Sequence, residues 1–231
     1  YPMNPAVSLH DLSYSYEDDP LSQVLSSVTL DVLPGELMML TGASGSGKTT
    51  LLTLIGGLRT GATGEIRVLN TDLISAQPRD LLELRRRVGF IFQTHNLLPC
   101  LSALDNIRMG LELHEDWRHK GAPKIHSRCQ EMLYLFGLES KANFMPKNLS
   151  VGQKQRISIA RAIASNPALI LADEPTASLD KDSALATIST LNDLARQNHA
   201  CVLVVTHDNK IMEYAHRTIH LVNGVISGSR C

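Results

Sequence analysis

The sequence LMMLTGASGSGKTTLLTL, residues 37–54, decides the fold of this 231-residue chain. An apolar run of strand length ends at Thr41, and three glycines (Gly42, Gly45 and Gly47) follow within the next six residues. Glycine permits backbone conformations in which consecutive N–H groups turn inward around an anion. The positive end of a helix predicted to begin near Lys48 points into the same hollow. This stretch therefore predicts a cradle for phosphate groups.

Lys48 and Thr49 supply the side chains that such a cradle uses. The ammonium group of Lys48 can lie against β- and γ-phosphates, and the hydroxyl of Thr49 is free to ligate Mg²⁺. The alternative is a Gly/Ser-rich surface turn that precedes a helix. The complete Gly-x4-Gly-Lys-Thr spacing between a strand and a helix favours a bound nucleoside triphosphate.

Composition limits the class of protein. A hydrophobic content of 43% and a charged content of 19% are ordinary for a soluble globular protein. The net charge of −1 gives no basic field for nucleic acid, and the run Arg85–Arg87 is predicted to be a solvated helix end. The four cysteines have no C-x-x-C spacing, which argues against a zinc ribbon or a disulfide framework. No stretch is apolar for long enough to span a bilayer, and the N-terminus lacks a signal-peptide pattern.

Three segments before and after the cradle alternate apolar and polar residues. Residues 7–16, 24–32 and 64–70 are therefore predicted as strands of a small antiparallel lobe beside the phosphate site. Tyr16 ends the first of them. Its ring either faces a nucleotide base or fills the edge of the core.

Polar residues end three predicted buried strands. Strand 88–92 ends at Gln93, strand 168–172 at Asp173 and Glu174, and strand 201–206 at His207. Ligands of α/β folds bind at the carboxyl ends of parallel strands, although Gln93 or His207 alone is compatible with an ordinary loop residue.

The adjacent acids Asp173 and Glu174 are the strongest signal among these strand ends. Burial of a carboxylate without a partner is unfavourable, so two acids directly after a buried strand indicate a functional site. The alternative, in which one acid is a helix N-cap and the other a surface residue, is the weaker explanation. Asp173 suits Mg²⁺ through its water shell, and Glu174 suits polarisation of an attacking water.

Residues 102–138 change to helical periods and predict an inserted helical lobe. In the sequence LSVGQ, residues 149–153, Ser150 is placed as an N-cap with Gln153 three residues later, before a helix predicted over 154–165. This helix N-terminus is also an anion site. If the lobe points away from the chain's own cradle, the anion must come from another subunit.

The remaining segments complete an α/β pattern. Residues 178–180 form a loop before an amphipathic helix over 181–196, and residues 218–227 form a hairpin turned at Asn223-Gly224.

Taken together, and in order over almost the whole chain, these motifs resemble those of ATP-binding cassette (ABC) ATPases. GASGSGKTT resembles Walker A, Gln93 the Q-loop, LSVGQ the signature sequence, and LILADE Walker B with its adjacent glutamate. Residues 178–180 resemble the D-loop, and His207 resembles the switch histidine.

The resemblance implies an ATPase that binds ATP and Mg²⁺. It implies catalytic roles for Glu174, His207 and Gln93, and Mg²⁺ ligation by Thr49, Gln93 and Asp173. The residues that it implies for nucleotide contact are Tyr16, Gly42, Ala43, Ser44, Gly45, Ser46, Gly47, Lys48, Thr49, Thr50, Ser150, Gly152, Gln153 and Asp180.

The implied fold is α/β, a P-loop NTPase with a RecA-like, mostly parallel sheet, an antiparallel β subdomain and an inserted α-helical signature subdomain. A single ABC ATPase domain is expected over residues 1–231. The β lobe is expected at about 5–36 and 62–72, the RecA-like core at about 37–95 and 166–231, and the helical subdomain at about 96–165.

Two stretches narrow the resemblance to a branch. FQTHNLLPCLSALDNI and LADEPTASLD resemble the branch that serves lipoprotein-release and macrolide-type exporters, and GKTTLLTLIGGLRT resembles its cyanobacterial DevA-type members. The branch implies a homodimer with composite ATP sites, peripheral at the cytoplasmic face of the plasma membrane. Its implied partners are a transmembrane permease and, through the permease, a periplasmic adaptor. In that branch the permease chooses the cargo, so the sequence does not predict which cargo is carried.

Val151 departs from the pattern of the family, whose signature usually has glycine at this position. In the family this loop approaches the γ-phosphate held by the other subunit, and a β-branched residue there is stiff. We expect Val151 to weaken ATP-driven closure without abolishing it. Ala43, where proline is common, should matter little.

Other classes of P-loop protein fit less well. A soluble ABC ATPase of DNA repair or chromosome maintenance carries a long coiled coil between Walker A and Walker B, and no heptad run occurs here. Translation types carry two cassettes in one chain. A GTPase or small-molecule kinase leaves the signature helix unexplained, and Asn209-Lys210 is not followed by the aspartate that reads guanine. An importer ATPase remains an alternative to an exporter.

Overall fold

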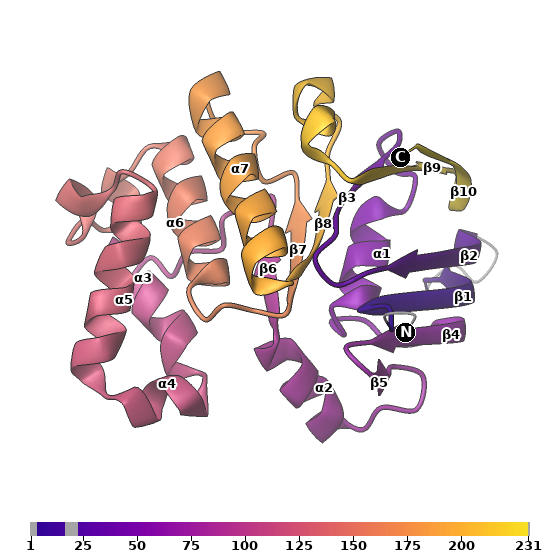
Figure 1. Cartoon of the computed structure of the whole chain (residues 1–231), viewed down its shortest axis with the longest axis horizontal. Helices are drawn as coiled ribbons and strands as arrows, with labels where there is room; N and C mark the ends of the chain where they lie inside the picture. The colour runs from indigo at the N-terminus through magenta and orange to yellow at the C-terminus, as the bar shows by residue number, and fades with distance from the viewer. Residues whose placement is uncertain (1–3, 17–22, 231) are drawn as a thin grey trace.

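The computed structural model describes residues 4–16 and 23–230. The structure contains two sheets, the larger running through the middle of the molecule and the smaller lying at one side (Figure 1). The larger has six strands in the order β10-β9-β3-β8-β7-β6, and every neighbouring pair is parallel except β9 and β10. Its strands are β3 (Leu37–Thr41), β6 (Val88–Ile91), β7 (Leu169–Asp173), β8 (Cys201–Val205), β9 (Arg217–Val222) and β10 (Val225–Arg230).

The smaller sheet is antiparallel, in the order β2-β1-β4-β5. Its strands are β1 (Val7–Ser15), β2 (Gln23–Val32), β4 (Thr63–Val68) and β5 (Thr71–Asp72). The α/β fold with a mostly parallel sheet and an antiparallel lobe is therefore confirmed.

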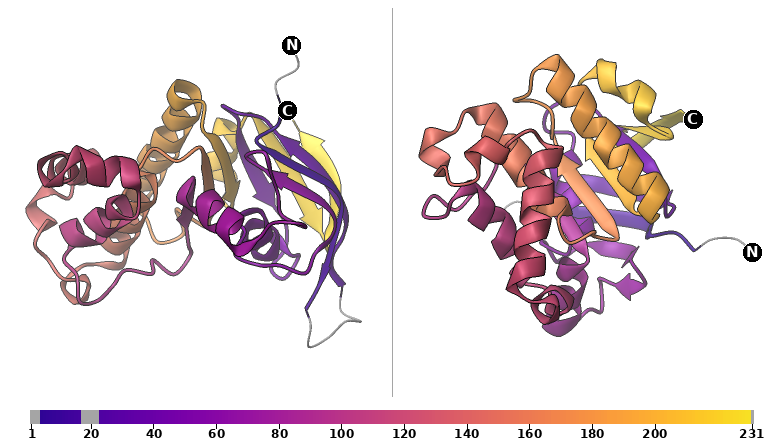
Figure 2. Two further views of the ribbon diagram at one scale, coloured as in Figure 1. Left: turned by 90° about the horizontal axis from the view of Figure 1, so that it is seen from below. Right: turned by 60° about the vertical axis from the view of Figure 1, so that its left-hand side comes forward.

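Helices cover the large sheet and form a lobe of their own. The helices are α1 (Lys48–Ile55), α2 (Pro78–Arg86), α3 (Ala103–Glu112), α4 (Glu115–Lys120), α5 (Ala122–Leu135), α6 (Val151–Ile163) and α7 (Lys181–Asn198), with short 3₁₀ turns η1 (Glu139–Lys141), η2 (Pro146–Asn148) and η3 (Asn209–Tyr214). Helices α3 to α6 gather at the end of the molecule opposite the antiparallel sheet (Figure 2).

Side chains of the large sheet pack into two separate hydrophobic cores, one on each face, because successive side chains of a strand point to opposite faces. Met38 and Leu40 join the core that holds α1 and the antiparallel sheet. Leu37 and Met39 join the core formed with α6, α7 and the helical lobe. Burial on both faces explains why β3, β7 and β8 are continuous apolar runs.

The segment after β6 is held by the helical lobe. The buried Asn106 side chain of α3 accepts from Leu98 N–H at 2.9 Å and donates to the carbonyls of Leu98, Leu101 and Ser102. Arg161 of α6 donates to the carbonyls of Asn96, at 2.8 Å, and His95. The chain thus joins the helical lobe within a few residues of Gln93. The exact subdomain boundaries expected from the sequence stay predictions.

Two local features differ from their sequence-based expectation. Helix α6 begins at Val151, not Lys154, because the capping box of Ser150 and Gln153 forms: Gln153 N–H donates to Ser150 Oγ, and Ser150 N–H donates to Gln153 Oε1. The run Arg85–Arg87 is not merely solvated, since Arg85 donates to Gly57 O at 2.6 and 3.0 Å. This arginine ties α2 to the end of α1.

Across residues 4–16 and 23–230, no helix combines the length and the hydropathy needed to cross a bilayer. The described cysteines, Cys100, Cys129 and Cys201, are free. Burial raises the pKa of Cys129 to about 11 and that of Cys201 to about 12, so both thiols stay protonated at neutral pH.

Candidate active site

The carboxyl ends of the central parallel strands meet at one edge of the sheet, where the chain leaves β3, β6, β7 and β8. A hollow of about 630 Å³ lies there. It is lined by Tyr16, Val24, Gly42, Ser44, Gly45, Gly47, Lys48, Thr49, Thr50, Gln93, Asp173, Glu174, Val205 and His207.

The glycine loop packs too closely for side chains at two points. Gly42 has a φ of 149°, and a Cβ there would lie 2.2 Å from Leu221 O. Gly47 has a φ of 100°, and its Cβ would lie 2.8 Å from a methyl group of Leu25. The loop is therefore pressed against β9 and β2, which keeps the N-terminus of α1 directed at the hollow.

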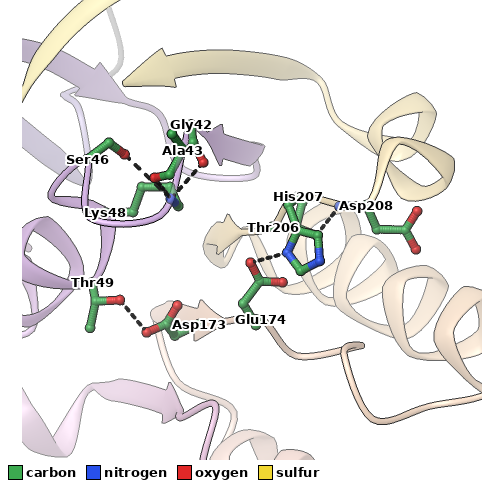
Figure 3. A network of polar contacts seen from close by, with 10 residues as sticks. All are labelled: Gly42, Ala43, Ser46, Lys48, Thr49, Asp173, Glu174, Thr206, His207 and Asp208. Atoms are coloured by element: carbon green, nitrogen blue, oxygen red, sulfur yellow. Dashed lines mark hydrogen bonds and ion pairs between the residues drawn. The ribbon is translucent and has the colours of Figure 1, made fainter. Parts of the chain in front are cut away.

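The Lys48 ammonium lies across this loop and donates to the carbonyls of Gly42 at 2.8 Å and Ala43 at 2.7 Å (Figure 3). A flexible cation at the mouth of a helix N-terminus is the arrangement that holds phosphate oxygens. The loop thus presents both the dipole of α1 and the positive charge of the Lys48 ammonium to an anion.

Oxygen ligands suited to Mg²⁺ lie together beside Lys48. The Thr49 hydroxyl donates to Asp173 Oδ2 at 2.7 Å, and the Gln93 side chain borders the same hollow. Among the described residues no group of three or more His, Cys, Asp or Glu side chains can hold a metal ion. This donor set fits Mg²⁺, which binds through one or two carboxylates and keeps the remaining positions for water and phosphate oxygens.

Glu174 and His207 form a charged pair across the hollow from Lys48. Glu174 Oε1 lies 2.7 Å from His207 Nδ1, and the Glu174 side chain is 13% exposed whereas that of His207 is 75% exposed. The hydrogen bond and the negative charge of Glu174 raise the pKa of His207. Glu174 also has a φ of 50°, an unfavourable conformation for a residue with a side chain.

Tyr16 borders the hollow, as predicted, and its side chain also contacts three neighbouring residues. Its hydroxyl lies 3.0 Å from Thr50 Oγ1, and the Arg59 guanidinium lies 4.9 Å from the ring centroid. Tyr14 packs edge-on against the same ring. The ring is thus fixed in position at the rim of the hollow, beside α1.

Several predicted residues do not line this hollow. Ala43 is exposed and contributes its carbonyl to Lys48, while Ser46 is buried, with its hydroxyl 3.5 Å from Lys48 Nζ. Four more belong to other helix N-termini and are absent from its lining: Ser150, Gly152, Gln153 and Asp180. Asp180 caps α7, where the backbone N–H of Ser183 lowers the pKa of the carboxylate.

Four further residues border or support the site without a motif to reveal them. Val24 and Val205 are apolar lining residues, Arg59 contacts Tyr16, and Gln155 binds the loop after Glu174. The sequence gives a weak signal for Gln155, because it is a polar residue on the mostly apolar face of a predicted helix. The other three are ordinary residues in sequence, and only the fold brings them to the hollow.

Comparison with known proteins agrees with this geometry. The family model described as ABC transporter matches residues 25–177. The lipoprotein-releasing system ATP-binding protein LolD of Bordetella pertussis is 36% identical over 222 residues, which cover 95% of this chain and 94% of that protein. An uncharacterized ABC transporter ATP-binding protein of Mycobacterium tuberculosis is 37% identical over 222 residues, which cover 95% of this chain and 88% of that protein.

Solved structures show the same architecture. The dimeric structure of MJ0796, a bacterial ABC transporter cassette, matches with a TM-score of 0.90 and 34% identity over 97% of both chains. A dimeric post-hydrolysis state of MJ0796 bound to ADP and Pi matches with a TM-score of 0.89 over the same share of both chains. The chain therefore belongs to the ABC transporter family and is an ATP-binding subunit with the ATPase activity of that family.

Proposed function

We propose that two copies of this chain close around two molecules of ATP with Mg²⁺, and that hydrolysis then reopens them to drive an export permease. The observation that carries the proposal is the arrangement around one hollow. Asp173, Glu174 and His207, at or just after the ends of β7 and β8, face the phosphate loop, and Thr49 at the start of α1 donates to Asp173. Positioning and charge stabilisation are what phosphoryl transfer requires.

Each side chain of the hollow has a role in this account. Lys48 and the N-terminus of α1 bind the β- and γ-phosphates, and Tyr16 supports the base. Thr49, Asp173 and Gln93 would hold Mg²⁺, which neutralises charge on the phosphate oxygens when bound. Ser44 and Thr50 lie within the same loop and helix start and contribute contacts to the phosphates.

Glu174 accepts a hydrogen bond from the attacking water and orients it in line with the γ-phosphate. His207 donates to a γ-phosphate oxygen and, through Nδ1, holds the carboxylate of Glu174 at 2.7 Å. Its raised pKa keeps more of the imidazole charged near neutral pH, which favours contact with a phosphate oxygen.

The second half of each site comes from the partner copy. The N-terminus of α6, with Ser150, Gly152 and Gln153, is a free anion site, and Asp180 lies at the start of α7. These residues do not line the hollow of their own chain. The dimeric assembly of the related MJ0796 cassette supports their meeting the hollow of a second copy.

The membrane partner follows from the relatives. LolD is named as the ATP-binding protein of a lipoprotein-releasing system, and it matches nearly the whole chain. We infer a transmembrane permease as partner, a peripheral position at the cytoplasmic face of the plasma membrane, and export as the direction. A periplasmic adaptor, reached through the permease, and the DevA-type resemblance belong to the same inference.

Substitution of Glu174 by glutamine tests the proposal. The variant Glu174→Gln should bind ATP with unchanged affinity but lose about a hundredfold or more in hydrolysis rate, because glutamine cannot accept the proton of the water. With ATP and Mg²⁺ it should remain a dimer in light scattering. Glu139→Gln, an exposed change in the helical lobe, is the control and should behave as wild type.

Retained hydrolysis in Glu174→Gln would show that Glu174 does not orient the attacking water. A variant that binds ATP yet stays monomeric at all concentrations would contradict the composite site.

A further inference from the structure

Helix α6 carries a fully buried glutamine that reaches out of the helical lobe. Gln155 is 1% exposed, and its Nε2 donates to the carbonyl of Pro175 at 3.1 Å. Its Oε1 has no partner among the described residues. A buried amide is costly unless its hydrogen bonds are made, so the bond to Pro175 is the contact that accounts for its position.

Pro175 is the residue directly after Glu174. Ala177 N–H donates to Glu174 O at 3.3 Å and Leu179 N–H donates to Thr176 O at 3.0 Å, so two tight turns follow β7. The Pro175 carbonyl takes no part in either bond. Gln155 is therefore the group that fixes the middle of this turn.

Glu174 is held on its other side by the sheet. Its N–H donates to Val205 O at 3.0 Å, which extends the pairing of β7 with β8. Its φ of 50° is a strained conformation, which persists only where the surroundings impose it. The strained residue thus lies between two hydrogen bonds, its own N–H to the Val205 carbonyl and the Gln155 amide to the Pro175 carbonyl.

The same helix is capped by Ser150 at its N-terminus, the anion-binding end proposed for the partner's γ-phosphate. Residues 151–163 form one uninterrupted helix, so displacement of its N-terminus also displaces Gln155. A Cβ added to Gly152 would lie 3.2 Å from Ser178 O, so the first turn of α6 also packs on the loop after Pro175. One rigid element thus touches both the anion end and the turn that carries Glu174.

We propose that Gln155 is a positioning residue for hydrolysis: through the Pro175 carbonyl it sets the backbone of Glu174 and couples the placement of α6 to the placement of that carboxylate. This inference rests on the proposed role of Glu174. Gln155 itself does not line the hollow, and its hydrogen bond among the described residues goes to the Pro175 carbonyl.

Two substitutions remove the donor while they preserve size. Gln155→Met keeps a side chain of similar length without a donor, and Gln155→Leu places a slightly shorter apolar side chain there. Both should lower kcat roughly ten- to a hundredfold with KM for ATP unchanged, because a small displacement of the carboxylate disturbs the attack geometry but not the phosphate cradle. Ser158→Ala is the matched control, since Ser158 is buried on the same helix and its hydroxyl has no partner among the described residues.

A double variant separates positioning from a general structural role. In the Glu174→Gln background, Gln155→Met should cause no further loss of hydrolysis, because both changes act on one group, and ATP-dependent dimerisation should be unchanged. A purely structural role would instead reduce dimerisation and add its loss to that of Glu174→Gln. Thermal unfolding of each variant shows whether the fold is intact.

Wild-type kcat in both Gln155 variants, with Glu174→Gln inactive, would overturn this inference and leave the proposed function standing. An active Glu174→Gln variant would overturn the proposed function instead. Loss of ATP affinity or of dimerisation in Gln155→Met and Gln155→Leu would also contradict the positioning role.

Discussion

Val151 is the residue at which the signature sequence departs from the glycine expected of the family. It occupies the first position of α6, directly after the Ser150 cap, and is 55% exposed. A branched apolar side chain thus stands beside the N–H groups proposed to meet the γ-phosphate of the partner copy. Branching at Cβ restricts its rotation, so the side chain cannot turn away without cost.

Replacement of Val151 should therefore strengthen closure. Val151→Gly is expected to tighten ATP-dependent dimerisation by about tenfold and to raise the hydrolysis rate, with Val151→Ala intermediate, because each step removes bulk from the interface. Analytical ultracentrifugation with ATP and steady-state hydrolysis measure the two effects. Equal dimerisation and equal rates across the series would show that Val151 has no part in closure.

His207 provides a prediction on pH. Its pKa is raised, so the imidazole stays charged to a higher pH than usual. The attraction between His207 and Glu174 is therefore complete below the ordinary histidine pKa of about 6.5, and it is lost as the pH rises through the raised pKa. Glu174→Gln removes the hydrogen bond to a carboxylate and the negative charge. The pKa of His207, followed by NMR, should then fall.

His114 serves as the internal reference for that titration. Burial lowers the pKa of His114, which lies in the helical lobe, and the Glu174 substitution should leave it unchanged. An unchanged pKa for His207 in Glu174→Gln would mean that the pair does not form in solution.

At the scale of elements, the contact between α3 and the segment after β6 organises the helical lobe. Asn106 is 0% exposed and makes four hydrogen bonds to the backbone between Leu98 and Ser102. These bonds replace a regular secondary structure for that segment. Their loss leaves partly buried backbone groups without these partners, which costs more than the bonds themselves contribute.

Asn106→Leu should therefore lower the free energy of unfolding by roughly 2–4 kcal/mol, measured by urea denaturation. The matched control is Thr187→Val on α7, because Thr187 is 1% exposed and its hydroxyl has no partner among the described residues. That change should be neutral or stabilising. Similar losses in the two variants would contradict the bracing role of Asn106.

The elements also show what local sequence can and cannot predict. The glycine loop, the buried strands and the Asn223-Gly224 hairpin carry their own signals, because periodicity and turn chemistry are local. The helix pattern alone places the start of α6 three residues late, although the capping box that fixes it is evident in the sequence. The sequence does not reveal Gln155 and Arg59 as parts of the site, because their partners, Pro175 and Tyr16, are distant in the chain.

At the scale of the whole molecule, the sheet brings Lys48, Gln93, Asp173, Glu174 and His207 to one edge. The strand ends predicted this meeting, since the carboxyl ends of parallel strands share an edge. The order of the strands had to come from the structure, because it depends on which crossovers are made. The N-terminus of α6 does not line this hollow, and the proposed function therefore makes each chain the source of two half-sites that only a second copy completes.

Mixing two inactive variants tests that central claim most directly. Lys48→Ala should lose phosphate binding, and Ser150→Arg should block the anion end of α6, so each alone should hydrolyse ATP at a background rate. In a mixed dimer, the cradle of the Ser150→Arg copy meets the intact α6 of the Lys48→Ala copy. An equal mixture should recover about a quarter of the wild-type rate, because half the dimers are mixed and each has one intact site. Failure of the mixture to exceed the background of either variant would contradict a site shared between two copies.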